Sequence, residues 1–196
     1  IQVWGANSKG QLGLGDFENR DIPTTLNVAV SGGFVDWEFD LNRVVAFNQD
    51  DMWAWGDNTY GQLGDGSNTN RNIPTFISTF IGREHIVLDN LTISMQISGG
   101  KVSSWGGNDY GQLTTNTMLS TDIPILLKDN EPVIDVSAGL DFTLIVKENG
   151  TVYGAGKNNK GQLGPSLDLN INFLELLPFT QVEKVYSGSS HSFVIT

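Results

Sequence analysis

The chain has 196 residues, of which 39% are hydrophobic, and its 22 acidic residues outnumber the 11 basic ones. This length and apolar content are sufficient for a folded core. The formal net charge of -11 repels phosphate backbones and anionic lipid surfaces. The basic residues are scattered along the chain, so the sequence disfavours nucleic-acid binding and favours a protein partner with a basic face.

Cysteine is absent, which excludes disulfide bonds and thiolate metal sites and leaves the cellular compartment undetermined. The chain also lacks an apolar run of about 18 residues, the length that a membrane-spanning helix needs. We therefore predict no membrane span.

A phrase of three residues divides the chain into units of about fifty. Gly-Gln-Leu occurs four times, at spacings of 51, 50 and 50 residues, and each copy follows another glycine by five positions. Self-similarity at this period indicates a repeat array. We expect one domain, 1–196, with repeat boundaries near 1–51, 52–101, 102–151 and 152–196. The predicted structural motif is Gly5, Gly10, Gln11, Leu12, Gly56, Gly61, Gln62, Leu63, Gly106, Gly111, Gln112, Leu113, Gly156, Gly161, Gln162 and Leu163.

We call the glycine five positions before each Gly-Gln-Leu phrase the marker glycine. The first three repeats share a tryptophan directly before it. Trp4, Trp55 and Trp105 stand there in turn, and a proline follows each glycine-rich loop. The third repeat departs from the others after its Gly-Gln-Leu phrase, where Thr114 replaces glycine. Because the tryptophans recur in register, we expect them to pack between repeats.

The strands are clearest in the unit that begins at Val133. Residues 133–138 and 142–146 are short apolar runs, Asn149-Gly150 predicts a tight type I′ hairpin, and 151–153 continues as the antiparallel partner strand. Helical periodicity is absent over any useful window. A unit of about fifty residues with these features predicts an all-β fold, a β-propeller segment of about four blades built from four-stranded antiparallel sheets.

The same residues resemble a known repeat. Ser137-Ala138-Gly139 before an apolar strand, the stretch 148–153 and the loop 156–164 are similar to the repeat of the regulator of chromosome condensation family, and 53–66 is more similar still. The resemblance covers nearly the whole chain and implies a propeller. Family members usually close with seven blades, within the roughly 4–8 blades of propellers in general. Where the family often has His before the apolar strand, this chain has Leu41, Leu91, Asp141 and His191.

The two ends of the chain fall on the two strands of one hairpin. Aligned on the repeat, Ile1 takes the position of Val152, and Thr196 takes the position of Val146. Either the first strand pairs with the last to close a ring, or the chain is a piece of a longer array. We expect the second, with the remaining propeller blades or a partner chain covering the apolar faces of the end blades.

The residues offer little for catalysis. His191 stands among serines in 187–192, but adjacent residues of a strand point to opposite faces, which is not the geometry of a catalytic triad. His85 is isolated, the stretch 65–70 is explained by turn formation rather than calcium binding, and the glycine-rich phrases lack the lysine of a phosphate loop. We predict no catalytic, cofactor-binding or metal-binding residue, and no enzyme.

Residues that break the repeat are the predicted partner contacts, because blade packing does not account for them. They are Trp37, Glu38, Arg43, Trp53, Arg83 and His85.

Three functions stay open. The first is a non-catalytic scaffold that binds a protein within a larger protein or assembly. The second, implied by the resemblance alone, is guanine nucleotide exchange on a small GTPase, although the spacing of 50 or 51 residues leaves no room for the wedge hairpin that exchange factors insert. The third, also implied by the resemblance, is an enzyme-binding or inhibitory propeller of bacterial type. Fold alone does not choose among them.

Overall fold

The computed structural model describes residues 1–49, 51–79, 83–88, 93–127, 131–165 and 170–196, with the backbone alone at 83, 84, 93–98, 172 and 173. Every regular element in these ranges is a β-strand. In chain order they are β1 (Gln2–Gly5), β2 (Arg20–Thr25), β3 (Asp36–Phe39), β4 (Arg43–Asn48), β5 (Asp51–Gly56), β6 (Arg71–Thr79), β7 (Arg83–Leu88), β8 (Ile93–Ser98), β9 (Lys101–Gly106), β10 (Thr121–Leu126), β11 (Val133–Gly139), β12 (Phe142–Lys147), β13 (Val152–Lys157), β14 (Asn170–Leu176), β15 (Lys184–Ser187) and β16 (Ser192–Ile195).

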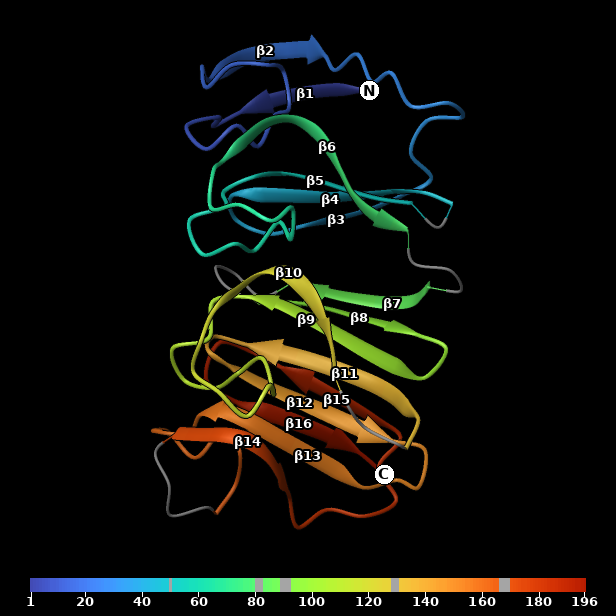
Figure 1. Cartoon of the computed structure of the whole chain (residues 1–196), viewed down its shortest axis with the longest axis vertical. Helices are drawn as coiled ribbons and strands as arrows, with labels where there is room; N and C mark the ends of the chain where they lie inside the picture. The colour runs from blue at the N-terminus through green and yellow to red at the C-terminus, as the bar shows by residue number, and fades with distance from the viewer. Residues whose placement is uncertain (50, 80–82, 89–92, 128–130, 166–169) are drawn as a thin grey trace.

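The strands form a stack of antiparallel sheets, which Figure 1 shows with the N-terminus at one end and the C-terminus near the other. Three sheets are complete blades of four strands, ordered β3-β4-β5-β6, β7-β8-β9-β10 and β11-β12-β13-β14. Two further sheets, β1-β2 and β15-β16, have two strands each. The all-β prediction and the partial propeller are thereby confirmed.

Each complete blade has an inner and an outer edge. The inner strands β3, β7, β11 and β15 contact one another in that order. The outer strands β6 and β10 lie on the opposite side of the stack (Figure 1) and contain Pro74 and Pro124. Proline cannot donate a ladder hydrogen bond, so it is tolerated at the edge of a sheet. The recurrent proline therefore marks the outer strand.

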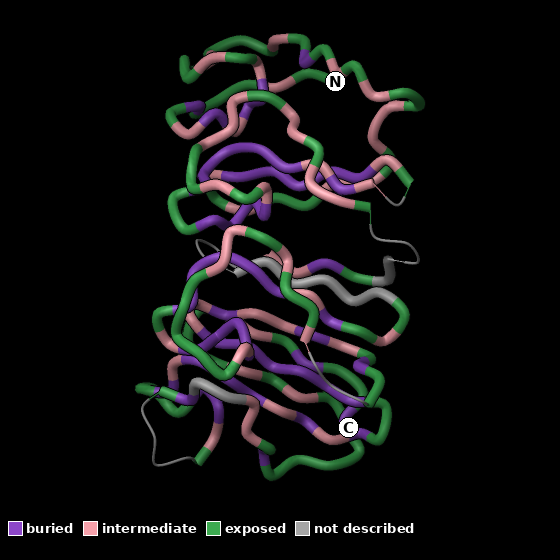
Figure 2. The backbone as a smooth tube through the Cα atoms, viewed as in Figure 1, coloured by how far each residue is buried: buried purple, intermediate pink, exposed green. Residues whose placement is uncertain are grey.

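The apolar core lies between neighbouring blades, as the buried segments in Figure 2 show. Phe47 and Leu63 from one blade pack with Ile86 and Trp105 from the next, and all are at most 4% exposed. Leu113 and Leu163 enter the two following interfaces in the same way. The leucine of each of these phrases thus fills an inter-blade core, and each blade depends on its neighbours for burial.

The recurrent loop is organised by two amide side chains, which are buried in every repeat except for the half-buried Gln11. An asparagine two residues after the marker glycine accepts the backbone N–H of the phrase leucine at 2.9 Å in all four repeats; the residues are Asn7, Asn58, Asn108 and Asn158. The phrase glutamine accepts the N–H two residues earlier at 2.8–3.0 Å, in Gln11, Gln62, Gln112 and Gln162. Buried backbone groups are costly without partners, which accounts for the recurrence of both amides.

The hairpin between β12 and β13 differs from the predicted type I′ turn. Gly150 has a φ of 77°, but Asn149 is not among the residues with positive φ. The Gly150 N–H donates to Lys147 O at 2.8 Å, and the Lys147 N–H donates to Thr151 O at 3.0 Å. These bonds close a three-residue loop, a turn followed by a left-handed glycine, which also suits the twist of antiparallel strands.

The three recurrent tryptophans have unequal surroundings. Trp55 and Trp105 are 1% and 0% exposed, whereas Trp4 is 60% exposed. The indole N–H groups of Trp55 and Trp105 donate at 3.0 Å to the carbonyls of Gln11 and Gln62 in the preceding repeats. Trp4 lies in the first sheet, which no described blade precedes, so the packing predicted for it is absent here.

Candidate protein-binding face

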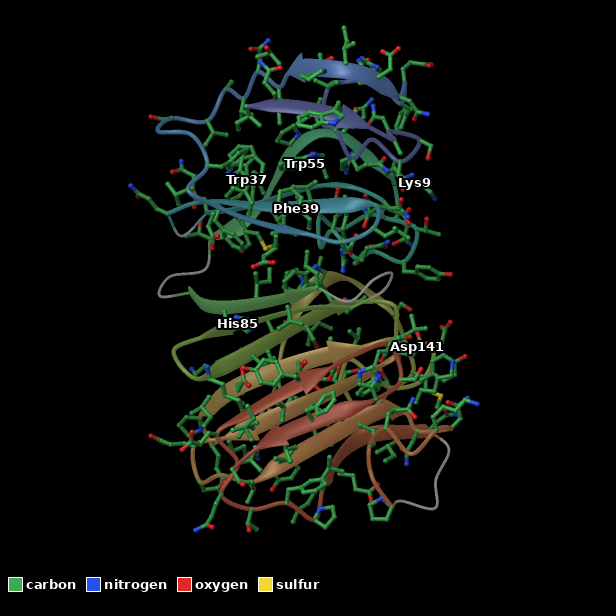
Figure 3. All side chains as sticks on the ribbon, turned by 180° about the vertical axis from the view of Figure 1, so that it is seen from behind. Lys9, Trp37, Phe39, Trp55, His85 and Asp141 are labelled. Atoms are coloured by element: carbon green, nitrogen blue, oxygen red, sulfur yellow. The ribbon has the colours of Figure 1, made fainter. Side chains whose placement is uncertain are left out.

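The inner strands bring two of the predicted contact residues into one cavity. Glu38 on β3 and His85 on β7 both line a cavity of about 410 Å³, together with residues of β11 and β15. Figure 3 shows this side of the stack, with His85 labelled at β7. We call the surface formed by β3, β7, β11 and β15 the inner face.

The charged groups of the cavity come from separate blades. Glu38 and His85 are exposed, as are Lys184 and Tyr186 on β15, and Asp135 on β11 is half-buried. Asp135 Oδ2 accepts the Val185 N–H at 2.9 Å, which links β11 to β15. Because the other side chains are exposed and line a hollow between blades, they can receive a polar group from a partner.

Trp37 and Trp53 belong to an aromatic cluster rather than to the inner-face cavity. The Trp37 ring lies 5.0 Å from Phe34 and 5.9 Å from Trp55, both edge to face, and stacks 6.1 Å from Phe39. Trp53 lies 5.6 Å from Phe76. Both tryptophans are half-buried and pack against the core of the first blade interface, so much of their area serves packing.

Arg43 is not on the surface. Its side chain is 1% exposed, forms an ion pair with Asp40, and donates from Nη1 to Gln62 O at 3.0 Å. Burial raises the pKa of the Asp40 carboxyl, while the charge of Arg43 acts in the opposite direction. Arg43 departs from the repeat yet has a packing role in this arrangement. The side chain of Arg83, at the start of β7, lies outside the described residues.

The start of β16 differs by one residue from its place in the repeat alignment of the sequence. The residues that pair with the marker glycines are Arg43, Ile93 and Phe142. An added Cβ at Gly139 would meet the Phe142 ring, and one at Gly188 would meet the His191 ring. His191 therefore corresponds to Phe142, not to Asp141 as the fixed spacing predicts, because the connecting segments differ in length.

A second set of polar contacts lies at the loop end of the blades. Lys9 Nζ lies 3.3 Å from Asp57 Oδ1 across the first blade interface. Lys157 Nζ lies 3.2 Å from Asp141 Oδ2 and 4.4 Å from the centre of the Tyr110 ring, and the hydrogen bond to Asp141 raises the pKa of Lys157. Figure 3 places Lys9 and Asp141 on the same edge of the stack. The contacts of Lys9 with Asp57 and of Lys157 with Tyr110 join neighbouring blades, and that of Lys157 with Asp141 lies within one blade, so we assign all three to stability.

The loop 65–70 is held by its own side chains. Asp65 Oδ1 accepts from Asn58 Nδ2 and from the Ser67 N–H at 3.0 and 3.1 Å, and Asp65 also pairs with Arg71. Within the described ranges, three or more His, Cys, Asp or Glu residues do not gather as a metal site would require. None of the described elements is a helix of the length and apolarity needed to span a bilayer.

The antiparallel four-stranded blades, their inter-blade cores and the inner face define a β-propeller segment. The chain belongs to the regulator of chromosome condensation (RCC1) repeat family, whose repeat matches residues 3–37, 49–88, 99–146 and 149–195. A second description of the same repeat matches residues 133–162.

Two curated relatives illustrate the range of proteins with this repeat. The chain is 32% identical to the ultraviolet-B receptor UVR8 of Arabidopsis thaliana, over 100% of the chain and 46% of the receptor. It is 27% identical to the E3 ubiquitin-protein ligase HERC2 of Homo sapiens, over 98% of the chain and 4% of the ligase. The chain thus spans less than half the length of either relative.

Solved structures show the same fold at lower identity. Human WBSCR16 superimposes with a TM-score of 0.83 at 20% identity, over 100% of this chain and 53% of that protein. Prp20p from Saccharomyces cerevisiae superimposes with a TM-score of 0.80 at 20% identity, over 100% of this chain and 50% of that protein. Its structure was described together with its binding to Gsp1p and histones.

Proposed function

We propose that this chain is a non-catalytic propeller segment that binds a protein partner through its inner face. The observation that carries the proposal is the convergence of Glu38, His85, Lys184 and Tyr186, from three different sheets, on one cavity of about 410 Å³. These exposed residues come from three segments that are far apart in the sequence, and the strands β3, β7 and β15 bring them to one side of the stack.

The charge of the chain indicates the chemistry of the partner. With a net charge of -11, the chain attracts a basic protein surface at long range. Glu38 and Asp135 supply carboxylates in the cavity, so a lysine or arginine of the partner is the group that we expect to enter it. Yeast Prp20p, which has this fold, was described with binding to Gsp1p and to histones, and this supports a protein as the class of partner.

Charge reversal at the inner face tests the proposal. The partner is first captured from an extract of the source organism on the immobilised chain, identified by mass spectrometry and purified. We expect Glu38→Lys to weaken its binding at least about tenfold in calorimetry, since one lost charged contact is worth about 1.4 kcal/mol or more. Glu148→Lys changes the net charge equally at an exposed hairpin tip and is the matched control.

The outcome separates the inner face from other surfaces. Equal weakening by Glu38→Lys and Glu148→Lys would show that only the overall charge matters, and no weakening by Glu38→Lys would remove the inner face as the site. The exchange-factor alternative is tested directly with a small GTPase. Nucleotide release catalysed by a substoichiometric amount of the isolated chain would contradict a non-catalytic role.

A further inference from the structure

The inner strands of the complete blades carry a row of equivalent residues, one from each blade. In every blade the row residue pairs with the second strand at the same number of positions after the residue that faces the marker glycine. The row residues are Asp36 on β3, His85 on β7 and Asp135 on β11. Because β7 contacts both β3 and β11, His85 has an aspartate at its own level on each neighbouring inner strand.

The side chains of this row point along the stack. Ile86, the next residue of β7, is buried in the core shared with the preceding blade. Adjacent residues of a strand point to opposite faces, so His85 points toward β11. The same reasoning applies to β3, where Trp37 packs against the preceding core and Glu38 points toward β7. Glu38 and His85 therefore both line the cavity of about 410 Å³.

The charges around His85 are mostly negative. The titratable side chains on the inner strands around it are Asp36 and Glu38 of β3, Asp135 of β11, and Lys184 and Tyr186 of β15. The remaining strand that β7 contacts, β8, contains no acidic or basic residue. On β7 itself, the side chains of Arg83 and Glu84 lie outside the described residues. An imidazole at this position is thus set among carboxylates from two neighbouring blades.

Histidine is the side chain whose charge ordinarily changes between pH 5 and 8. While His85 is neutral, the cavity presents the negative charge of Glu38 and Asp135 to an entering cation. When His85 is protonated, its imidazolium partly neutralises those carboxylates and repels an entering lysine or arginine. The protonation of His85 therefore sets the charge of the cavity just below neutral pH.

We propose that protonation of His85 releases the partner from the inner face. The neutral histidine admits the lysine or arginine of the partner, and the charged histidine excludes it. Because this cavity is the one in which the proposed function places the partner's cation, the regulation rests on that function. Binding is tight near neutral pH and weak in an acidic medium. By linkage, binding of the partner also expels the proton from His85.

Calorimetry with the purified partner at pH 7.5 and at pH 5.5 tests this regulation. A histidine with the reference pKa of about 6.5 is about one-tenth protonated at the higher pH and about nine-tenths protonated at the lower. If only the neutral form binds, the dissociation constant rises about tenfold between the two. His85→Gln keeps a polar side chain without the titration, so we expect its dissociation constant to change less than about twofold.

The chain has one other histidine, His191, which lines a different cavity. His191→Gln is the matched control and is expected to keep the change of about tenfold. Titrations near pH 6.5 in two buffers of different protonation enthalpy count the protons released on binding. We expect the unsubstituted chain to release about half a proton more than His85→Gln, since a histidine is about half protonated there. Far-UV circular dichroism at each pH checks that the variants are folded.

The outcomes separate a failure of the regulation from a failure of the binding site. If Glu38→Lys weakens binding at pH 7.5 but the unsubstituted chain and His85→Gln respond equally to acid, the inner face binds the partner and His85 does not regulate it. Tighter binding at pH 5.5 that depends on His85 would also overturn the regulation and would indicate an acidic group in the partner. If Glu38→Lys leaves binding at pH 7.5 unchanged, the site is wrong and both proposals fail.

Discussion

Replacing Trp105 by alanine is expected to lower the free energy of unfolding by about 3–5 kcal/mol, the usual cost of removing a buried aromatic side chain. Trp105 is 0% exposed and lies in the core between two complete blades. Its indole N–H also donates to Gln62 O at 3.0 Å, so the substitution removes a hydrogen bond as well as apolar contacts.

Trp4 is the matched control, because it occupies the same repeat position and is 60% exposed. Trp4→Ala is expected to lower the free energy of unfolding by less than about 1 kcal/mol. Urea unfolding followed by far-UV circular dichroism gives both values. Equal losses from the two substitutions would show that the tryptophan acts within its own blade, contrary to the inter-blade core described here.

A second pair of substitutions separates backbone strain from a steric clash. Gly5 and Gly56 have nearly the same φ, 106° and 105°. An added Cβ at Gly56 would lie 2.3 Å from Asn42 O and 2.7 Å from Arg43 Cα, whereas one at Gly5 would meet nothing within 4 Å. Gly5→Ala is therefore expected to lower the free energy of unfolding by about 1–3 kcal/mol, because alanine is strained at a positive φ.

Gly56→Ala adds the clash with a neighbouring strand, and the strands β4 and β5 would have to separate. The expected decrease in the free energy of unfolding is about 4 kcal/mol or more, a size that is typical of disrupted core packing. Both variants are compared by urea unfolding. If Gly56→Ala costs no more than Gly5→Ala, close strand approach is not the reason for the glycine, and positive φ alone would explain its recurrence.

The repeat made much of the fold predictable. Glycine, glutamine and leucine recur because each repeat builds the same loop, with Gln62 holding a backbone N–H and Leu63 filling a core. The positions of the two ends in the repeat were predictable to within one residue, since the pairing of β15 with β16 puts Thr196 at the position of Lys147 rather than of Val146. The repeat predicts these features because each blade packs the same set of strands against its neighbours.

The candidate site was less predictable. Arg43 breaks the repeat and was therefore expected at the surface, but it is buried against Asp40. The carboxylate three residues earlier was a signal that could have indicated an internal ion pair. Glu38 and His85 were predicted partner contacts and line the cavity, whereas Lys184 and Tyr186, which also line it, were not singled out in the sequence, because their convergence depends on the contact of inner strands from separate blades. Departure from a repeat shows that a residue is unusual, not where its side chain lies.

The central claim is that the inner face binds the partner. Hydrogen–deuterium exchange of the chain, alone and with the purified partner, tests it most directly, because it reports protection strand by strand. We predict that binding slows exchange at the segments around the cavity, 36–39, 85–88, 133–137 and 184–187. Slower exchange confined to the outer strands β6, β10 and β14 or to the glycine-rich loops, with these segments unchanged, would contradict the proposed site.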